Sequence, residues 1–509
     1  MLKKQNNIVL ILIVLVALTL RLVGITHGFP FIFHPDEPTT VRSALGIRFD
    51  ANPKHFDWPH LYIYLNYFLY MVFAKIRTFA LASSAGSFIV KTFPLISNDN
   101  LIFYFLTRCF SAILGALTTI PVYLAGKKLF GKNAGLLAAA TIAFMPYHVW
   151  HSHYSLPDVP MVFFMSWALY FTVLILKGSE LKNYLFSGLF VGLSASTKYN
   201  GGLSALMIPI AHFTGLFSKK RVDKAVRVVT VKGLFALFIS AVAAVFGFVL
   251  GTPYAVLDFK TFSRTDGPQG AFWQFTNVGS VRLSEHFSKF VSELGGRIIV
   301  DTGYSVIVGC IILFAWLLSR IVRNKVEQRE YYLIFLYVLA VFLIWFISGF
   351  EKNRSHYYFI AYPFLALIFG YFCEYFSFLV GGGKKFMSTL FLVLAFIPLL
   401  FFSLESSYSF VQGDTRNELY SWLVGNVKPG ENVIYNDSIL SDVLQSLQLN
   451  TKKGTDQISG YTSALVVLAD EQNDKVFLSK NAQNLKESVY FDNTLRLGPS
   501  ISVYNYLKK

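Results

Sequence analysis

The chain is dominated by apolar runs of roughly 20 residues, separated by short loops in which lysine and arginine gather. A helix of that length crosses the hydrocarbon core of a bilayer and satisfies its own backbone hydrogen bonds there. Because 54% of the 509 residues are hydrophobic and only 15% are charged, the chain is far more apolar than a soluble domain. The sequence therefore predicts an α-helical polytopic membrane protein.

The basic loops set the direction of each crossing. A net charge of +16 could suggest a nucleic-acid partner, but most of the lysines and arginines flank apolar runs. Cytoplasmic loops carry an excess of these residues, so the charge indicates topology and no nucleic acid. Lys3 and Lys4 predict a cytoplasmic N-terminus, Lys127 and Lys128 predict a cytoplasmic loop, and everything after Glu405 is expected outside.

We expect about 11 transmembrane helices. The first is an uncleaved span, because Arg21 follows its apolar run where a signal peptide would have small residues. The expected spans are 8–20, 101–125, 134–149, 160–176, 184–197, 203–217, 233–250, 304–318, 331–350, 359–380 and 387–402. Residues 58–96 hold a further apolar segment. Its two halves both cross or neither does, and we favour an amphipathic helix along the interface.

Composition changes near residue 404. The last hundred residues are more polar and alternate short apolar runs with helix-like stretches, which is typical of a small α/β domain. We therefore expect a membrane domain over 1–403, with extracytoplasmic loops at 26–100 and 251–302, and an extracytoplasmic α/β domain over 404–509. The cysteines, Cys109, Cys310 and Cys373, lie inside apolar runs, so no disulfide framework is expected.

Two acids follow the first span in the sequence His34-Pro35-Asp36-Glu37-Pro38. They can be solvated loop carboxylates. The prolines, however, stiffen the loop, and the surrounding chain is aromatic and poor in charge, so desolvation is expected to raise the basicity of the carboxylates. Such a carboxylate can take a proton from an attacking hydroxyl.

Asp158 precedes another apolar run and is expected at the N-terminus of a helix, on the same side of the membrane as Asp36. The helix end alone would favour an anion there. We expect Asp36 to lie in a loop without such a helix end and therefore to be the stronger base of the two.

Cations interrupt or border apolar runs on that same outer side. Lys198 breaks the stretch 184–217, and an ionisable residue at membrane depth is functional by default, although it can also snorkel to the interface. Arg354 and His356 precede the span 359–380. Because the positive-inside bias disfavours cations outside, we expect an anion such as a lipid phosphate as their partner.

Histidines near the acids allow a metal site as an alternative. His34, His151 and His153 with the acids offer a His-x-His spacing that some metal sites use. Histidines beside interfacial aromatic residues, here Trp150 and Tyr154, are more often anchors or hydrogen-bond partners. We expect no metal and no cofactor.

The motifs, taken in order, resemble a known family. They are the acid pair, Arg108-Cys109-Phe110-Ser111-Ala112, Tyr123-x4-Lys128-Leu129-Phe130-Gly131, the stretch 146–158, and Gly188-x3-Gly192-Leu193-x3-Thr197-Lys198. The chain resembles the membrane glycosyltransferases of family 39, the group of protein O-mannosyltransferases and lipid A aminoarabinose transferases, whose fold is of the GT-C type. The similarity covers roughly residues 8–380.

This resemblance implies an enzyme of the cell membrane that inverts the sugar it transfers. The donor is a polyprenyl-phosphate sugar, and the acceptor is a hydroxyl of a protein, lipid or glycan on the extracytoplasmic face. The resemblance implies Asp36 as the catalytic base with Glu37 beside it, Asp158 as a second acid, and Lys198, Arg354, His356 and Arg108 as ligands of the donor phosphate.

A second interpretation of the same residues is that the chain is a transporter or flippase for a polyprenyl-linked or anionic lipid. Buried charge and broken helices also suit that function. It would require no acceptor. A membrane metalloenzyme using the histidines is a third reading.

The charge pattern makes a topological prediction that reporter fusions can check. Fusions after Glu37, Lys198 and Glu405 are expected to report an extracytoplasmic position, and fusions after Lys128, Arg221 and Lys385 a cytoplasmic one. A cytoplasmic signal at Glu405 would contradict the predicted number of crossings.

Overall fold

The computed structural model describes residues 2–508 apart from 84–85, 99, 179 and 215–230. The chain divides into two compact units, which are described separately. The first comprises Met1–Leu22 and Asp36–Leu404, and the second comprises Val23–Pro35 and Glu405–Lys509.

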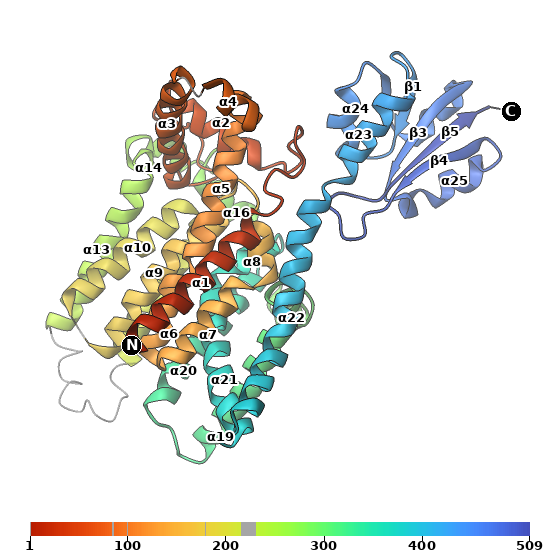
Figure 1. Ribbon diagram of the computed structural model, residues 1–509. Coiled ribbons are helices and arrows are strands. Elements are labelled where there is room, and N and C mark those ends of the chain that lie inside the picture. The colour runs from red at the N-terminus through yellow and green to blue at the C-terminus, as the bar shows by residue number, and fades with distance from the viewer. Residues whose placement is uncertain (1, 84–85, 99, 179, 215–230, 509) are drawn as a thin grey trace. The chain divides into compact units, whose positions relative to one another are not determined.

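The first unit is a bundle of long helices (Figure 1). Among the described residues, seven helical stretches are long and apolar enough to cross a membrane, or up to eight if one bent pair counts as a single span. The seven are Ile102–Leu129 (α5, Ile102–Leu117, with α6, Thr119–Leu129), Asp158–Lys177 (α9), Val231–Gly251 (α13), Tyr304–Val322 (α19), Gln328–Ser348 (α20), Ser355–Gly381 (η5, Ser355–Ala361, with α21, Tyr362–Gly381) and Lys385–Gln412 (α22).

The predicted count of eleven spans is not confirmed. The expected span 134–149 is a helix of only 12 residues, α7 (Lys132–Ala143), because the chain turns before Pro146 and begins the short α8 (Pro146–His151). The stretch 184–217 is divided, as expected, at Lys198, and gives α10 (Leu181–Thr197), a 3-10 segment η2 (Tyr199–Leu206) and α11 (Met207–Thr214). The basic run at 219–221 lies outside the described residues.

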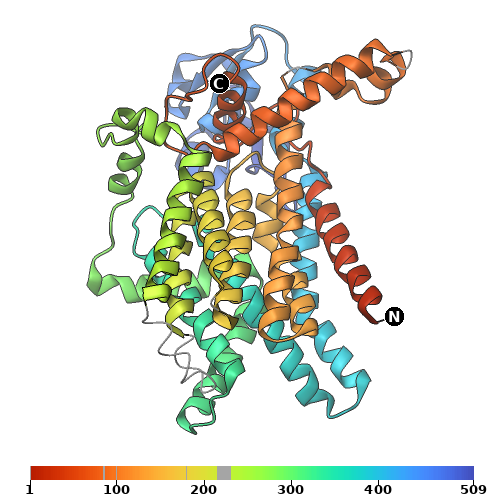
Figure 2. The same ribbon diagram turned by 90° about the vertical axis from the view of Figure 1, so that its left-hand side faces the viewer.

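The apolar segment at 58–96 forms the bent pair. α3 (Leu61–Ala82) and α4 (Gly86–Thr92) meet at an angle of 119°. Figure 2 shows α3 at the end of the bundle, running at an angle to the long helices. This orientation favours the prediction that α3 lies along the membrane interface.

Close backbone contact between α10 and α13 explains the glycine spacing in the chain. A Cβ atom added at Gly188 would lie 2.1 Å from the carbonyl oxygen of Ser240, and one at Gly192 would lie 2.1 Å from that of Ala244. Small residues four apart let two membrane helices approach at the backbone. This packing fixes the end of α10, where Lys198 follows.

α21 lies at the centre of the unit and packs against α6, α7, α19 and α20. Its side chains from Tyr362 to Cys373 are all buried. A helix that is apolar all round is expected in the interior of a bundle. Because η5 leads directly into α21, this rigid core positions the residues from 354 onward.

Other helical elements complete this unit. They are α1 (Leu2–Leu22), α2 (Glu37–Gly46), η1 (Pro94–Ser97), α14 (Tyr254–Leu257), α15 (Phe259–Phe262), α16 (Ala271–Asn277), α17 (Leu283–Glu293), the π-helical turn η4 (Leu294–Ile298) and α18 (Ile299–Thr302).

The second unit is a small α/β domain, as predicted. Its five strands are β1 (Asn432–Tyr435), β2 (Asn450–Lys453), β3 (Ser463–Ala469), β4 (Leu485–Phe491) and β5 (Ile501–Leu507), in the order β2-β1-β3-β5-β4. β1 pairs in parallel with β2 and β3, and β5 runs antiparallel to β3 and β4. The central strand β3 is buried along almost its whole length, as a strand covered on both faces should be.

Helical segments accompany this sheet. Residues 23–35 also belong to this unit, which the sequence did not indicate. The segments are α23 (Thr415–Asn426), η6 (Ser438–Leu440), α24 (Ser441–Gln445), η7 (Thr455–Gly460), η8 (Glu471–Asp474) and α25 (Lys475–Asn481). The Asn417 side chain donates to the carbonyl oxygens of Gly28 (3.2 Å) and Phe29 (2.8 Å). The Arg416 guanidinium lies 3.7 Å from the centre of the Phe33 ring, a cation–π contact.

Candidate functional site

The acid pair after the first helix is divided between two environments. The Glu37 side chain is fully buried, and its carboxylate oxygens accept hydrogen bonds from Nε and Nη2 of Arg108, both at 2.7 Å. Oε1 also accepts from the backbone N–H of Ser155 at 2.9 Å. A planar bidentate pair of this kind fixes geometry as well as charge. Glu37 therefore links the first loop to α5 and to the loop that precedes Asp158.

Asp36 is the more accessible acid of the pair. It is only partly buried and stands at the N-cap of α2, which begins at Glu37 and carries Pro38 in its first turn. The expectation that Asp36 lies in a loop away from a helix end is wrong, because proline is well accommodated in the first turn of a helix. Both Asp36 and Asp158 therefore stand at helix N-termini, and this feature does not distinguish their basicities.

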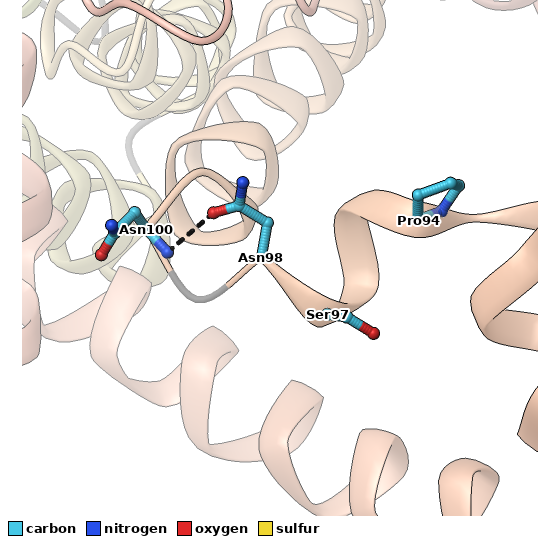
Figure 3. A pocket seen from close by; sticks show the side chains of 4 residues that line it. All are labelled: Pro94, Ser97, Asn98 and Asn100. Carbon is cyan, nitrogen blue, oxygen red and sulfur yellow. Dashed lines mark hydrogen bonds between the residues drawn. The ribbon is translucent and has the colours of Figure 1, made fainter. Parts of the chain in front are cut away.

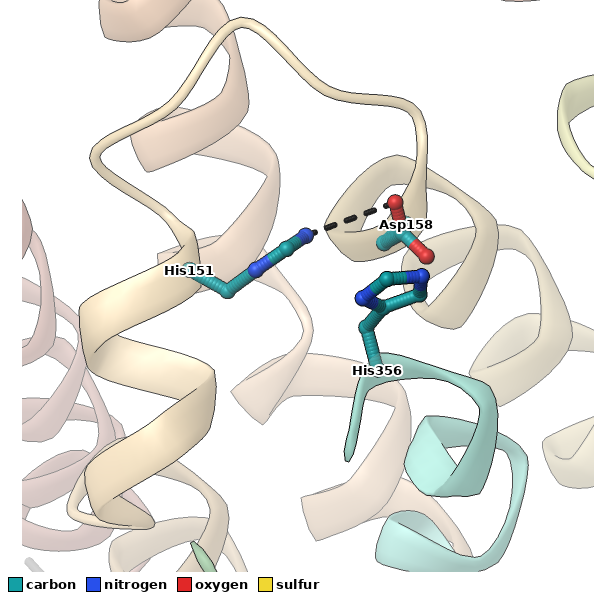
Figure 4. A group of neighbouring side chains, drawn as sticks. All are labelled: His151, Asp158 and His356. Carbon is teal, nitrogen blue, oxygen red and sulfur yellow. Dashed lines mark ion pairs between the residues drawn. The ribbon is translucent and has the colours of Figure 1, made fainter. Parts of the chain in front are cut away.

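Asp158 is the centre of a buried cluster (Figure 4). It opens α9, and its side chain is 3% exposed. One carboxylate oxygen accepts from the Lys198 ammonium, and the other lies 3.4 Å from Nε2 of His151. The rings of His151 and His356 stack with centroids 5.3 Å apart. Three predicted site residues, Asp158, Lys198 and His356, thus meet in one place.

Lys198 faces an aromatic residue as well as the carboxylate. Its side chain is 14% exposed, and its ammonium lies 5.4 Å from the centre of the Tyr357 ring. Arg354 precedes this segment, is exposed, and acts electrostatically on His356 and Tyr147. The cluster therefore combines a partly buried ammonium with an accessible guanidinium, which together can receive an anion.

A fully buried arginine fixes the histidine-bearing loop. Arg21 of α1 donates to the carbonyl oxygen of Ala143 at 3.0 Å and to the Ser152 hydroxyl at 3.2 Å, and its Nη2 lies 2.8 Å from Nδ1 of His148. Burial and the neighbouring guanidinium lower the pKa of His148 well below its ordinary value, so this imidazole is neutral. Arg21 thus anchors α1 to the helices that position His151.

Three donor groups could hold a metal ion. Ligand atoms of His151, Asp158 and His356 lie within 4.8 Å of one another. This set differs from the histidines that the sequence suggested, since Nδ1 of His153 lies 3.0 Å from the carbonyl oxygen of Val149. The Lys198 ammonium already contacts Asp158, so a divalent cation would have to compete with a fixed positive charge. The arrangement suits an anion better.

A hollow of about 410 Å³ lies elsewhere, lined by Pro94, Ser97, Asn98 and Asn100 (Figure 3). Oδ1 of Asn98 accepts from the backbone N–H groups of Asn100 and Leu101, both at 3.1 Å, at the start of α5. The Asn98 side chain thus binds backbone groups just before α5. The four described lining residues include no acid, imidazole or cation, so they give no basis for a catalytic role.

The sequence did not indicate the structural roles of Arg21 and Ser155. The sequence also did not indicate that Arg108 pairs with Glu37. No periodicity connects residues 37 and 108, and their contact depends on tertiary packing.

Comparison with known proteins supports the resemblance. Residues 85–248 match the family model described as dolichyl-phosphate-mannose-protein mannosyltransferase. This stretch contains Arg108, His151, Asp158 and Lys198. No curated protein matches the chain.

Solved structures share the architecture at low identity. The archaeal oligosaccharyltransferase AglB of Archaeoglobus fulgidus, in complex with an inhibitory peptide and a dolichol-phosphate, is 14% identical with a TM-score of 0.50, covering 100% of this chain and 74% of that one. ArnT of Cupriavidus metallidurans, bound to undecaprenyl phosphate, is 11% identical with a TM-score of 0.49, covering 97% of each chain. The Saccharomyces cerevisiae Pmt1-Pmt2 complex, bound to its sugar donor, is 19% identical with a TM-score of 0.36, covering 50% of this chain and 34% of that one.

The family model and the similar structures are those of membrane glycosyltransferases with the GT-C fold. At these identities, the structural likeness concerns the fold. Together with the apolar helices, it makes this chain an integral membrane protein.

The buried ion pair gives a prediction about folding. Arg108→Met leaves the Glu37 carboxylate buried without its cation, which is expected to cost about 3–5 kcal/mol of folding free energy. The double variant with Glu37→Gln is expected to recover most of this loss, because no charge remains buried. Thermal unfolding of the purified protein in detergent measures the effect, with Arg48→Met, at an exposed residue, as the control. Equal stability of Arg108→Met and Arg48→Met would contradict a structural role for the pair.

Proposed function

We propose that this chain, which has the fold of the GT-C membrane glycosyltransferases, transfers a sugar from a polyprenyl-phosphate donor to a hydroxyl of an acceptor. The reaction takes place at the extracytoplasmic face, where the basic loops of the sequence locate the acids and Lys198. The observation that carries the proposal is the cluster of Lys198, His151 and His356 around Asp158. Arg354 stands two residues before His356 in the chain.

The cations of this cluster receive the donor phosphate. Lys198 is held in place by Asp158 and by the Tyr357 ring, so little reorganisation is needed when an anion arrives. Arg354 is exposed and can approach a phosphate from the bulk side. His356 adds a hydrogen-bond donor. The polyprenyl chain remains in the bilayer. The resemblance implied that Arg108 contacts the donor phosphate. We propose instead that Arg108 holds Glu37 in position.

Asp36 accepts the proton of the acceptor hydroxyl. The hydroxyl oxygen attacks the anomeric carbon from the side opposite the phosphate, the carbon–oxygen bond to the phosphate breaks, and its electron pair leaves with the polyprenyl phosphate. The proton moves to Asp36. No acid is needed to protonate the leaving group, because fixed cations stabilise its charge.

Accessibility distinguishes the three acids. Glu37 is fully buried against Arg108, and the Asp158 carboxylate is bound by Lys198, so each is already neutralised by a cation. Asp36 is the acid that an acceptor can reach, since it is only partly buried. Asp158 therefore acts as the positioning residue for Lys198.

The acceptor can be a protein, lipid or glycan, and membrane lipids surround the site. A flippase of anionic lipids would use the same cations without an acceptor, and it is the second candidate because the helices are broken near Lys198. A flippase moves its lipid whether or not Asp36 is basic, and this difference separates the two functions.

Single-turnover sugar transfer with purified protein tests the mechanism. Asp36→Asn is expected to lower the transfer rate by about 10²–10⁴ with donor affinity nearly unchanged, because only a base is lost. Lys198→Met and Arg354→Ala are expected to weaken donor binding, because each removes a phosphate ligand. Asp50→Asn, at a surface acid of the same loop, is the control.

Two results would end this account of the reaction. One is full transfer by Asp36→Asn, which would leave the proton without the proposed acceptor. The other is normal donor use by both cation variants at limiting donor concentration. We also expect sugar transfer to continue after treatment with a metal chelator. The Lys198 ammonium already contacts Asp158, so a metal ion would have to compete with it for this carboxylate.

A further inference from the structure

A second group of polar side chains lies along one helical segment of the membrane unit. Glu293, Arg297 and Asp301 follow one another at intervals of four residues through α17, η4 and α18. This spacing places them on nearly the same side of a helix. Nη1 of Arg297 donates to Oδ1 of Asn353 at 2.9 Å, and Nδ2 of Asn353 donates to the Tyr358 hydroxyl at 3.1 Å. The helix thereby faces the segment that leads to His356.

Several buried polar atoms at the end of this segment have no partner. Among the described residues, Oδ2 of Asp301, Oγ of Ser305 and the hydroxyl of Tyr362 are buried without a hydrogen bond. Tyr362 is 0% exposed. A buried polar group without a partner costs about 1–3 kcal/mol, so these groups need a polar ligand or ordered water.

The burial of the Asp301 carboxylate is only partly compensated by its neighbours. Burial raises its pKa to about 6, although Ser355 and Arg297 act in the opposite direction. Near neutral pH most of it is therefore ionised, and it lacks a full set of hydrogen-bond donors. A ligand that donates hydrogen bonds without carrying positive charge would satisfy it.

Asp301 and Tyr362 lie close to the cluster proposed to bind the phosphate. α18 packs against α8, and the ring of Tyr147 in α8 lies 5.5 Å from that of His151. Tyr147 is close enough to both Asp158 and Asp301 to be affected by their charges. The Tyr362 ring lies 4.9 Å from that of Phe359, which in turn borders His151 at 5.3 Å.

We propose that Asp301 and Tyr362 bind the hydroxyls of the sugar ring that is transferred, while its phosphate lies against Lys198 and His356. This inference rests on the proposed function. A sugar hydroxyl both donates and accepts, so it can satisfy a carboxylate oxygen and a phenol at the same time. The Tyr147 ring, which is near both Asp158 and Asp301, offers an aromatic surface for the apolar face of the sugar.

The contribution of the sugar to donor affinity tests this subsite. The probes are polyprenyl phosphate alone and the same lipid carrying mannose, glucose, galactose or N-acetylglucosamine. They are titrated against the wild type and the variants Asp301→Asn and Tyr362→Phe. Tyr337→Phe is the matched control, since the Tyr337 hydroxyl is also buried but already donates to the carbonyl oxygen of Cys310 at 2.7 Å.

At least one sugar-bearing lipid is expected to bind the wild type more tightly than the bare lipid, by about tenfold or more, as hydrogen bonds to a charged group allow. Asp301→Asn is expected to remove most of that gain and Tyr362→Phe to reduce it about fivefold. Both variants should bind the bare lipid as the wild type does, and Tyr337→Phe should keep the whole gain. Tyr362→Phe decides the matter if Asp301→Asn does not fold.

The outcomes separate the two proposals. If the wild type binds none of the lipids, the proposed function fails. If it binds all of them equally, or if both variants keep the gain from the sugar, the subsite fails and the proposed function stands. Equal weakening of bare and sugar-bearing lipids in both variants also overturns the subsite, because it assigns these residues to the phosphate or to folding.

Discussion

A carboxylate without access to water connects the parts of this site. Glu37 accepts from Arg108 on α5 and from the backbone of Ser155, so it joins the first loop, a membrane helix and the loop before α9. Because a buried charge is tolerated only with its partners in place, these three elements must pack together before the domain is stable. The neighbouring residue Asp36 and the cluster around Asp158 are held by the same contact.

We propose different roles for the three acids because their environments differ. Arg108 neutralises Glu37 in the interior, Lys198 neutralises Asp158 at the start of α9, and Asp36 stands partly exposed at the N-cap of α2. The first contact joins three elements of the unit, the second holds the Lys198 ammonium, and in the proposed reaction the third acid is the one that an acceptor reaches. Charge alone would assign all three the same role, whereas burial and geometry separate them.

Much of this arrangement follows from local patterns in the sequence. The long apolar runs, the break at Lys198 and the alternating pattern of the C-terminal domain are each set by residues close together in the chain, so they could be predicted. The number of spans could not, because α7 ends after 12 residues where the chain turns before Pro146. A proline was also misleading, since Pro38 stabilises the first turn of α2 and leaves Asp36 at a helix end.

The contacts that define the site lie far apart in sequence. His356 approaches Asp158 through the packing of α21, and the segment 23–35 joins the C-terminal unit through Asn417. Such pairings have no periodicity, so one sequence carries little sign of them. Asp301 was recognisable in principle as an acid just before a span, but the unpaired atoms that distinguish it appear only in three dimensions.

In the proposed reaction, the cluster around Lys198 binds the phosphate of a polyprenyl lipid. The most direct measurement compares equilibrium binding of polyprenyl monophosphate with that of the uncharged polyprenol, using the unmodified protein in lipid nanodiscs. We expect saturable binding of the monophosphate, at least about tenfold tighter than that of the alcohol, because charge-assisted hydrogen bonds hold the phosphate. Equal binding of the two lipids would contradict it, because the cations would then have no part in recognition.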